Sequence, residues 1–331
     1  MVSLQAVQQA NAGIGSLPAG LVALFMGATS GIGQSALQHF AQHAPSPRIY
    51  SIARPSAAGS HETFLDSLRS SNPSGTYNLI EANVSLISEI DRIVADIKEK
   101  NETKIDILFM SAGFMAFEGR KDTSEGLDPS MSTRYYSRLR LVQQLVPLLN
   151  NAPSPRVVSV LGGGLESPLN EHDLDLRDPR NWTFWSSSMH SGTMGTLTLE
   201  RIARANPNLS IVHWFPGTVA TPGLARANQF GMSPPNPTSA DEAGQRGAFI
   251  ATNDRYAVQE GLVPVPVGLS PVQRSGGGIF LVDPAGEGSN NERVLAGLRK
   301  RGVDDAVWRF TEGIFASAAE VGRSSQAKDE L

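Results

Sequence analysis

Seven residues near the N-terminus, Gly27-Ala28-Thr29-Ser30-Gly31-Ile32-Gly33, have the composition and spacing of a phosphate-binding turn. They follow the apolar run Leu21–Met26 and open the helix-period segment Ile32–Gln42. Glycine lets the backbone approach a pyrophosphate closely, and the N-terminus of a helix offers unpaired N–H groups and a positive dipole. Glycine also ends strands that bind nothing, so the prediction of a dinucleotide site depends on the strand, turn and helix together. The expected contacts are Gly27, Thr29, Ser30, Gly31, Ile32 and Gly33.

Three further strand ends have motifs that, with GATSGIG, resemble the short-chain dehydrogenase/reductase family over nearly the whole chain. Ser111-Ala112-Gly113 is similar to the family's NAG turn, Asn83-Val84 stands where the family approaches adenine, and Pro216–Thr221 matches its PGxVxT segment, which holds the nicotinamide carboxamide. All of them lie at carboxyl ends of predicted strands, the edge where open α/β sheets bind ligands. The resemblance therefore implies cofactor contacts at Asn83, Val84, Ser111, Ala112, Gly113, Pro216, Gly217, Val219 and Thr221.

The end of the second predicted strand indicates which dinucleotide binds. The segment Ile49–Arg54 contains no acid for a ribose 2′-hydroxyl, and Arg54 occupies the expected position. A guanidinium can make bidentate, charge-assisted hydrogen bonds to a 2′-phosphate. We therefore expect NADP(H), the alternative being that Arg54 is an ordinary solvated surface residue.

The family's proton-donating apparatus is missing. In the family, a tyrosine and a lysine four residues later share a helix face, and the lysine lowers the tyrosine pKa so that the phenol protonates a carbonyl oxygen. Alignment on Leu199–Ala203 puts the tyrosine position at Ser188 and the lysine position at Gly192. The family's serine falls within Gly162-Gly163-Gly164, and its asparagine near Arg134. None of the five tyrosines has lysine four residues on, so this absence does not depend on the alignment.

Other side chains are candidates for the catalytic work. His190 has a suitable unperturbed pKa, although such a histidine is often a cap or a surface group. Tyr135 and Tyr136 lie on the long helix expected to face the cleft, where aromatic residues usually belong to the core. Arg138 could orient an enolate or phenolate oxygen or form a salt bridge, and Ser188 retains a hydroxyl that is a poor acid.

At finer grain the chain resembles a branch of the family from fungal specialised-metabolite pathways, in which the Tyr–Lys pair is commonly missing. Members of that branch are associated with reducing polyketide-like compounds, including their conjugated C=C bonds. The resemblance implies an NADPH-dependent reductase acting on C=C or on a ketone. Two alternatives stay open: a non-redox cyclase or isomerase, and a non-catalytic NADP(H)-binding protein.

Aromatic and sulfur-containing residues near the predicted strand ends suit a flat, apolar small-molecule substrate, although some of them must be ordinary core. They are Phe114, Met115, Phe117, Trp182, Phe184, Trp185, Trp214, Phe215, Phe230 and Met232.

Strand and helix patterns alternate along the chain, which predicts right-handed crossovers and a mainly parallel sheet covered on both faces. We expect an α/β fold, a single doubly wound Rossmann-type domain over residues 1–331 with a seven-stranded sheet. Residues 1–20 are expected to form a helix and linker. Residues 221–275 are expected to form a substrate lid before the last strand. The strands are Leu21–Met26, Arg48–Ile52, Tyr77–Glu81, Ile105–Met110, Arg156–Leu161, Ser210–Trp214 and Gly278–Val282, and the helices are Ile32–Gln42, Glu62–Arg69, Ile87–Lys100, Leu127–Asn150, Ser191–Arg204 and Asp241–Ala251.

Composition excludes several classes of protein. The net charge of −4 gives no basic footprint for nucleic acid, and the absence of cysteine excludes disulfides and thiolate chemistry. No histidine spacing indicates a metal, and no apolar run is long enough to cross a membrane. The C-terminal Lys328–Leu331 spells a retention signal, but no signal peptide is evident, so a cytoplasmic protein is expected. The family resemblance implies homo-oligomers assembled through the long central helices, which Arg134, Arg138 and Arg140 would oppose.

Overall fold

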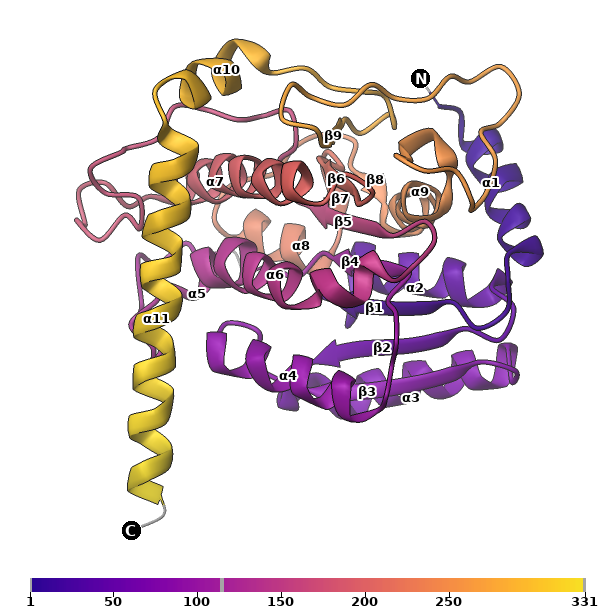
Figure 1. The fold of residues 1–331 in the computed structure, drawn as a ribbon, viewed down its shortest axis with the longest axis horizontal. Helices are drawn as coiled ribbons and strands as arrows, with labels where there is room; N and C mark the ends of the chain where they lie inside the picture. Colours follow the sequence, from indigo (N-terminus) through magenta and orange to yellow (C-terminus); the bar gives the residue numbers. More distant parts are fainter. Residues whose placement is uncertain (1, 114–115, 330–331) are drawn as a thin grey trace.

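Seven parallel strands form the sheet of the computed structural model, which describes residues 2–113 and 116–329. The strand order is β3-β2-β1-β4-β5-β6-β9 (Figure 1). Successive strands are therefore added on one side of β1 up to β3 and on its other side from β4 onward. Such a reversal is where doubly wound sheets bind dinucleotides. This architecture confirms the expected fold class. The strands are β1 Val22–Met26, β2 Arg48–Ala53, β3 Thr76–Glu81, β4 Ile107–Met110, β5 Arg156–Val160, β6 Ser210–Trp214 and β9 Phe280–Val282.

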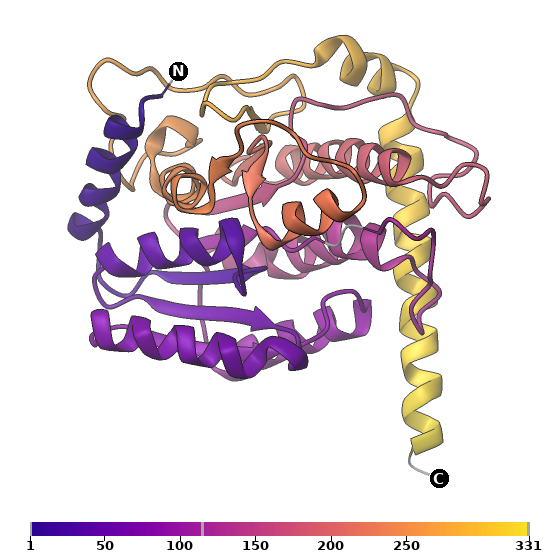
Figure 2. The same ribbon diagram turned by 180° about the vertical axis from the view of Figure 1, so that it is seen from behind.

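Helices cover both faces of the sheet because their apolar residues recur every three or four positions. In front of the sheet in Figure 1 lie α4 (Ile87–Glu99), α6 (Ser137–Asn150) and α7 (Phe184–Ala205). The opposite face, seen in Figure 2, is covered by α2 (Gly31–His43), α3 (Pro55–Ser71) and α9 (Ala240–Thr252), with α1 (Leu4–Ala12) beside α9. The two faces hold separate apolar cores, and the strands, buried on both sides, contribute to each.

The long helix expected over residues 127–150 is interrupted near its start. A short α5 (Pro129–Met131) leads into a π-helical turn, η2 (Ser132–Tyr136), and α6 follows directly. The Asp128 side chain caps α5 by accepting a hydrogen bond from the Met131 amide at 2.9 Å. π-Helical turns occur mostly at functional sites. Here the turn carries Arg134, and Arg138 follows one turn later.

The excursion between β6 and β9 divides into two parts. The first contains a two-stranded ladder, β7 (Val219–Ala220) and β8 (Thr238–Ser239), flanking α8 (Pro222–Gln229), in which only Ala227 is buried. The second contains α9, which packs into the core through Phe249 and Ile250, and the short η3 (Asp254–Tyr256). Because α9 belongs to the core, the lid expected over residues 221–275 is interrupted by a packed helix.

Two C-terminal helices were not predicted. α10 (Glu292–Lys300) and α11 (Val303–Asp329) follow β9, and α11 runs along the edge of the molecule past α7, α6 and α4 (Figures 1 and 2). Val307 and Phe315 bury their side chains in the core under this helix. A search of the described residues for a helix that could cross a membrane finds none.

Candidate functional site

The glycine-rich turn Gly27–Gly33 follows β1 and packs against the residues that end β4. The Ser111 and Ala112 amides both donate to the Met26 carbonyl, at 2.8 and 3.0 Å, and Ser111 Oγ donates to the Gly27 carbonyl at 3.0 Å. Gly27 has a φ of +106°, and a Cβ there would lie 2.2 Å from the Ala112 nitrogen. A Cβ on Gly33 would lie 2.3 Å from Ser111 Oγ. Backbone packing this close leaves room only for glycine at both positions.

The N-terminus of α2 leaves its amides available to an anion. Ser30 precedes the helix in an extended conformation, and its side chain makes no capping hydrogen bond. The first-turn N–H groups have no partner within a helix, so an incoming phosphate can accept from them. Gly31, at φ +60°, packs against Thr221, whose Cγ2 would be 2.9 Å from a Cβ on the glycine. The turn and the PGTVAT segment therefore meet, as a shared cofactor site requires, and this arrangement fits a pyrophosphate.

The adenine side of the site is exposed. Arg54 is the N-cap residue of α3, with Pro55 at the first helical position, and its side chain lies in solvent beside the end of β2. Asn83 is also exposed and accepts hydrogen bonds from the Ser85 amide and hydroxyl at 3.2 and 2.9 Å, while Val84 is buried. A cation beside the first turn of a helix suits the 2′-phosphate of NADP(H).

Glycines replace side chains around the expected nicotinamide position. Among the described residues, no atom lies within 4 Å of a Cβ built on Gly113, Gly162 or Gly192. Gly192 stands at the family's lysine position and Gly162 in the segment of its serine. The described part of the chain therefore leaves space where the family places its catalytic side chains.

Two of the replaced positions touch each other. Arg134 Nη1 donates a 2.8 Å hydrogen bond to Ser188 Oγ, joining the asparagine position on η2 to the tyrosine position on α7. Ser188 Oγ in turn donates to the Phe184 carbonyl at 2.7 Å, and the Arg134 guanidinium lies 5.6 Å from the Phe184 ring centroid. Burial lowers the pKa of Arg134 to about 10, which leaves it charged at neutral pH. The sequence did not indicate a contact between Arg134 and Ser188, because this contact depends on how the two helices pack.

Arg138 follows Arg134 by one helical turn and is buried. Its Nη1 donates to Ser159 Oγ and the Val160 carbonyl, both at 2.9 Å, and its Nη2 donates to the Ala112 carbonyl. Only 4 % of the residue is exposed, and burial, with the neighbouring Arg134, lowers its pKa to about 9. Arg138 thus ties the ends of β4 and β5 together rather than facing a substrate, and the expectation that it orients an enolate has no support in its contacts.

The histidine and tyrosines expected to donate a proton are already engaged. His190 Nε2 accepts from the Asn170 amide at 3.0 Å, and Nδ1 faces the Leu174 carbonyl at 3.3 Å. A carbonyl only accepts, so Nδ1 carries the proton and the ring is neutral; burial lowers its pKa further. Tyr135 bonds Thr311 of α11 at 2.7 Å and Tyr136 donates to Asp175 at 2.8 Å, and burial raises both phenol pKa values. These three side chains anchor neighbouring segments, so the two tyrosines are held in the interior instead of facing the cleft as expected, and both ring nitrogens of His190 are occupied.

A hydrogen-bonded chain holds the glycine turn after β5. His213 Nε2 accepts from the Gly162 amide at 3.2 Å, which assigns the proton to Nδ1, and Nδ1 lies 2.8 Å from Thr196 Oγ1. Thr196 donates to Glu166 at 2.7 Å, and Glu166 also accepts from the Gly164 amide at 3.0 Å. Burial, helped by the positive charge of Arg138, lowers the pKa of His213 to about 3. Nothing in the sequence pattern indicated this chain.

Some of the aromatic residues expected to line a pocket gather at the strand ends. Phe117, Phe184 and Phe230 stack in a row, and Trp185 packs edge-on against Phe184. Trp214 instead fills the core, where its Nε1 donates to the Asp283 carbonyl. The expected Phe114 and Met115 lie outside the described residues.

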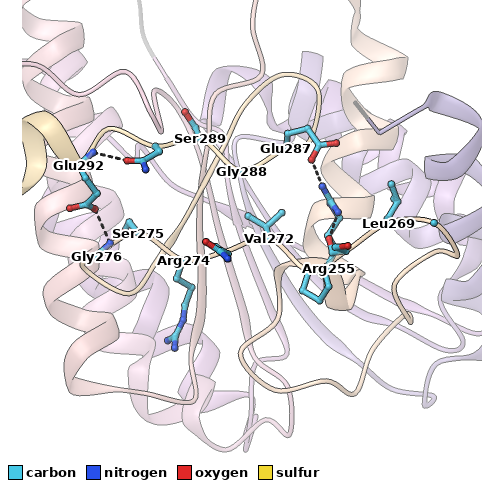
Figure 3. Close-up of a pocket in the computed structure, with 15 residues that line it drawn as sticks. Arg255, Leu269, Val272, Arg274, Ser275, Gly276, Glu287, Gly288, Ser289 and Glu292 are labelled. Atoms are coloured by element: carbon cyan, nitrogen blue, oxygen red, sulfur yellow. Dashed lines mark hydrogen bonds and ion pairs between the residues drawn. The ribbon is translucent and has the colours of Figure 1, made fainter.

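The described residues also form an open polar cavity of about 660 Å³ away from these motifs. Loops 268–276 and 287–292 line it together with Arg255 (Figure 3). Arg255 is held by Glu287 and by the Ser270 carbonyl, and none of the expected cofactor contacts reaches the cavity. We therefore place the functional site at the strand ends. In residues 2–113 and 116–329, no group of three His, Asp or Glu side chains could hold a metal ion.

Comparison with known proteins identifies the family of the chain. Residues 21–167 match the model of the short chain dehydrogenase family. Over all 331 residues, and the whole of the relative, the chain is 94% identical to an NmrA-like family domain-containing oxidoreductase, notO, of Aspergillus sp. (strain MF297-2). It is 37% identical to oxidoreductase AN1596 of Emericella nidulans, covering 96% of this chain and 99% of the relative.

Solved structures show the same fold at low identity. The NADPH-bound carbonyl reductase from chicken fatty liver superposes with a TM-score of 0.56 at 17% identity, covering 83% of this chain and 100% of that one. An uncharacterised protein from Mycobacterium paratuberculosis gives a TM-score of 0.61 at 17% identity, covering 92% and 97%. Motifs, sheet order and relatives lead to one assignment: the chain is an oxidoreductase that belongs to the short-chain dehydrogenase/reductase superfamily.

Proposed function

We propose that this oxidoreductase uses NADP(H) to reduce an aromatic or polyketide-like intermediate of a fungal specialised-metabolite pathway, at a C=C bond conjugated to a carbonyl. The observation that carries the proposal is the Arg134–Ser188 pair, which stands where the family has its proton donor and the asparagine that supports it. NotO and AN1596, both fungal proteins described as oxidoreductases, support the reaction class.

The cofactor would be held by the motifs described above. The α2 N-terminus and the Gly27 and Gly33 backbone would bind the pyrophosphate, Arg54 the 2′-phosphate, and the PGTVAT segment the nicotinamide end. When bound, NADPH supplies a hydride to the substrate carbon farther from the carbonyl. We place that carbon on the side of the site where Gly162 and Gly192 each lack, among the residues that the structure describes, a neighbour that a Cβ would meet.

Arg134 would stabilise the charge that develops on the substrate oxygen. Hydride addition to a conjugated C=C bond moves an electron pair onto the carbonyl oxygen, giving an enolate. A buried guanidinium gives strong charge-assisted hydrogen bonds to such an oxygen, because water does not screen them. Ser188 positions Arg134, since its Oγ accepts from the guanidinium and donates to the Phe184 carbonyl. The enolate carbon then takes a proton from water, so no side-chain acid is required.

The reaction can be tested with a compound that offers both bonds. 4-Phenyl-3-buten-2-one would be incubated with the protein and NADPH deuterated at C4, using each face in turn. We expect 4-phenylbutan-2-one with deuterium at the carbon bearing the phenyl ring. Deuterium at the carbinol carbon of an allylic alcohol would show ketone reduction instead and would overturn the C=C assignment.

Two other outcomes would overturn redox chemistry altogether. Conversion of this ketone or of a pathway intermediate without cofactor consumption would indicate a cyclase or an isomerase. Tight NADPH binding without turnover on any intermediate would indicate a binding protein.

The cofactor preference has its own test. Arg54→Ala should weaken NADPH binding by about tenfold or more while leaving NADH binding nearly unchanged, because only NADPH carries the 2′-phosphate. Arg48→Ala is the matched control, since Arg48 lies at the other end of β2 and pairs with Glu102. Equal affinities for the two cofactors, unaltered in Arg54→Ala, would contradict the assignment.

A further inference from the structure

Three phenylalanine rings from separate parts of the chain stack in a row above the strand ends. Phe117 follows β4, Phe184 begins α7, and Phe230 is the C-cap residue of α8. The Phe117 centroid lies 4.8 Å from that of Phe184 and 4.5 Å from that of Phe230, with interplanar angles of 29° and 22°. Both pairs are stacked face to face and not edge-on.

The outer ring of the stack is weakly held. Phe230 is 46% exposed, although large apolar side chains are normally buried, and α8 buries only Ala227. A helix with so few buried contacts can shift at little cost. Phe230 is therefore a ring that can separate from Phe117 and admit another ring between them.

The inner end of the stack leads to the proposed reaction centre. The Arg134 guanidinium lies over Phe184, 5.6 Å from its centroid, and bonds Ser188. The other end is connected to the cofactor site, because α8 starts at Thr221, which packs against Gly31. The stack therefore reaches the Arg134–Ser188 pair at its Phe184 end, and its Phe230 end belongs to a helix whose start contacts the phosphate turn.

We propose that Phe117 and Phe230 hold a planar aromatic ring of the substrate between them, while the part of the molecule that is reduced extends past Phe184 toward Arg134. This inference rests on the proposed function and specifies its substrate class: a flat, conjugated ring system bearing a carbonyl or phenolic oxygen. The stack favours the planar molecule, because a saturated ring of the same outline is thicker and offers neither phenylalanine an aromatic face.

Binding of 2-naphthol and of trans-decahydro-2-naphthol tests this, because the two share a skeleton and a hydroxyl and differ in planarity. Calorimetry on the protein loaded with NADP⁺ should give at least about tenfold tighter binding of 2-naphthol. Phe230→Leu, which stays apolar but loses the ring, should remove most of that preference, and Phe230→Tyr should retain it. Val267→Ala, at a fully exposed residue outside the stack, is the control and should change neither affinity.

Equal binding of the two probes to the native protein, or a 2-naphthol affinity that Phe230→Leu leaves unaltered, would overturn the inference. So would an equal loss for both probes in Phe230→Leu, since that would show apolar contact without selection of planarity. NADPH affinity measured on each variant reports whether the fold is retained. Because these measurements need no turnover, a failed deuterium transfer with a retained 2-naphthol preference would reject the reductase and leave the ring site standing.

Discussion

Protonation of His213 should destabilise the native protein as the pH falls. The ring is buried, with a pKa lowered to about 3, whereas an exposed histidine in the unfolded chain titrates near 6.5. Below about pH 6.5 the His213 side chain binds a proton in the unfolded chain but stays neutral in the native protein. The free energy of unfolding therefore decreases with decreasing pH. Between pH 7 and pH 5 the two pKa values give a loss of about 2 kcal/mol from this residue alone.

Urea unfolding of the native protein and of His213→Gln, at pH 7 and at pH 5, measures this contribution. Glutamine can still accept from the Gly162 amide, but it does not titrate. Other histidines with lowered pKa values, such as His61 and His190, act in the same direction in both proteins. The decrease should therefore be about 2 kcal/mol smaller in His213→Gln, whatever its stability at pH 7.

The control is His172→Gln, at an exposed residue. This variant should lose as much stability between the two pH values as the native protein does. An equal decrease in the native protein and in His213→Gln would refute the reasoning, because it would mean that His213 is not held neutral by the fold.

Three further changes probe the cofactor turn, the proposed oxyanion site and the C-terminal helix. Gly33→Ala should abolish NADPH binding measured by fluorescence, since its Cβ would lie 2.3 Å from Ser111 Oγ, whereas Gly59→Ala, with open space on α3, should bind normally. Arg134→Met should lower kcat by about 10²- to 10³-fold with NADPH affinity retained; Arg140→Met, on the same helix but paired with Asp91, should not. Deletion of 303–331 should uncover the apolar faces of α4, α6 and α7, lower the Tm and cause further association detectable by light scattering; an unchanged Tm and an unchanged particle size would contradict this.

The fold could be predicted because each strand and most helices carry their own signal. A strand buried on both faces is a continuous apolar run, as in Val22–Met26, and a helix over one face repeats its apolar residues, as in α4. The start of α7 at Phe184 was missed because its first turns are rich in serine, which favours other conformations in isolation. Tertiary contacts and the Thr183 capping box determine that start instead.

The site could be predicted only where it is local in the sequence. The phosphate turn is one contiguous motif, so the sequence alone identifies its glycines and indicates that the backbone must pack closely there. The Arg134–Ser188 contact joins residues 54 positions apart, and Arg134 lies in a π-helical turn that sets the direction of its side chain. The spacing of apolar residues in the sequence predicts neither the contact nor the turn. His190 misled for the same reason, because the loop segment that occupies both its nitrogens lies 16 to 20 residues earlier in the chain.

Exchange of a tyrosine for an arginine–serine pair changes which reaction such a site favours. A phenol of lowered pKa both stabilises a developing negative charge and gives up its proton. A guanidinium with a pKa near 10 stabilises the charge and keeps its proton at neutral pH. Reduction of a ketone forms an alkoxide, which is strongly basic and needs a proton as it forms. Reduction of a conjugated C=C bond forms an enolate, whose delocalised charge makes it less basic. Water can protonate the enolate in a later step. Under the proposed reaction, Arg134 therefore favours C=C bonds by omitting the step that a ketone requires.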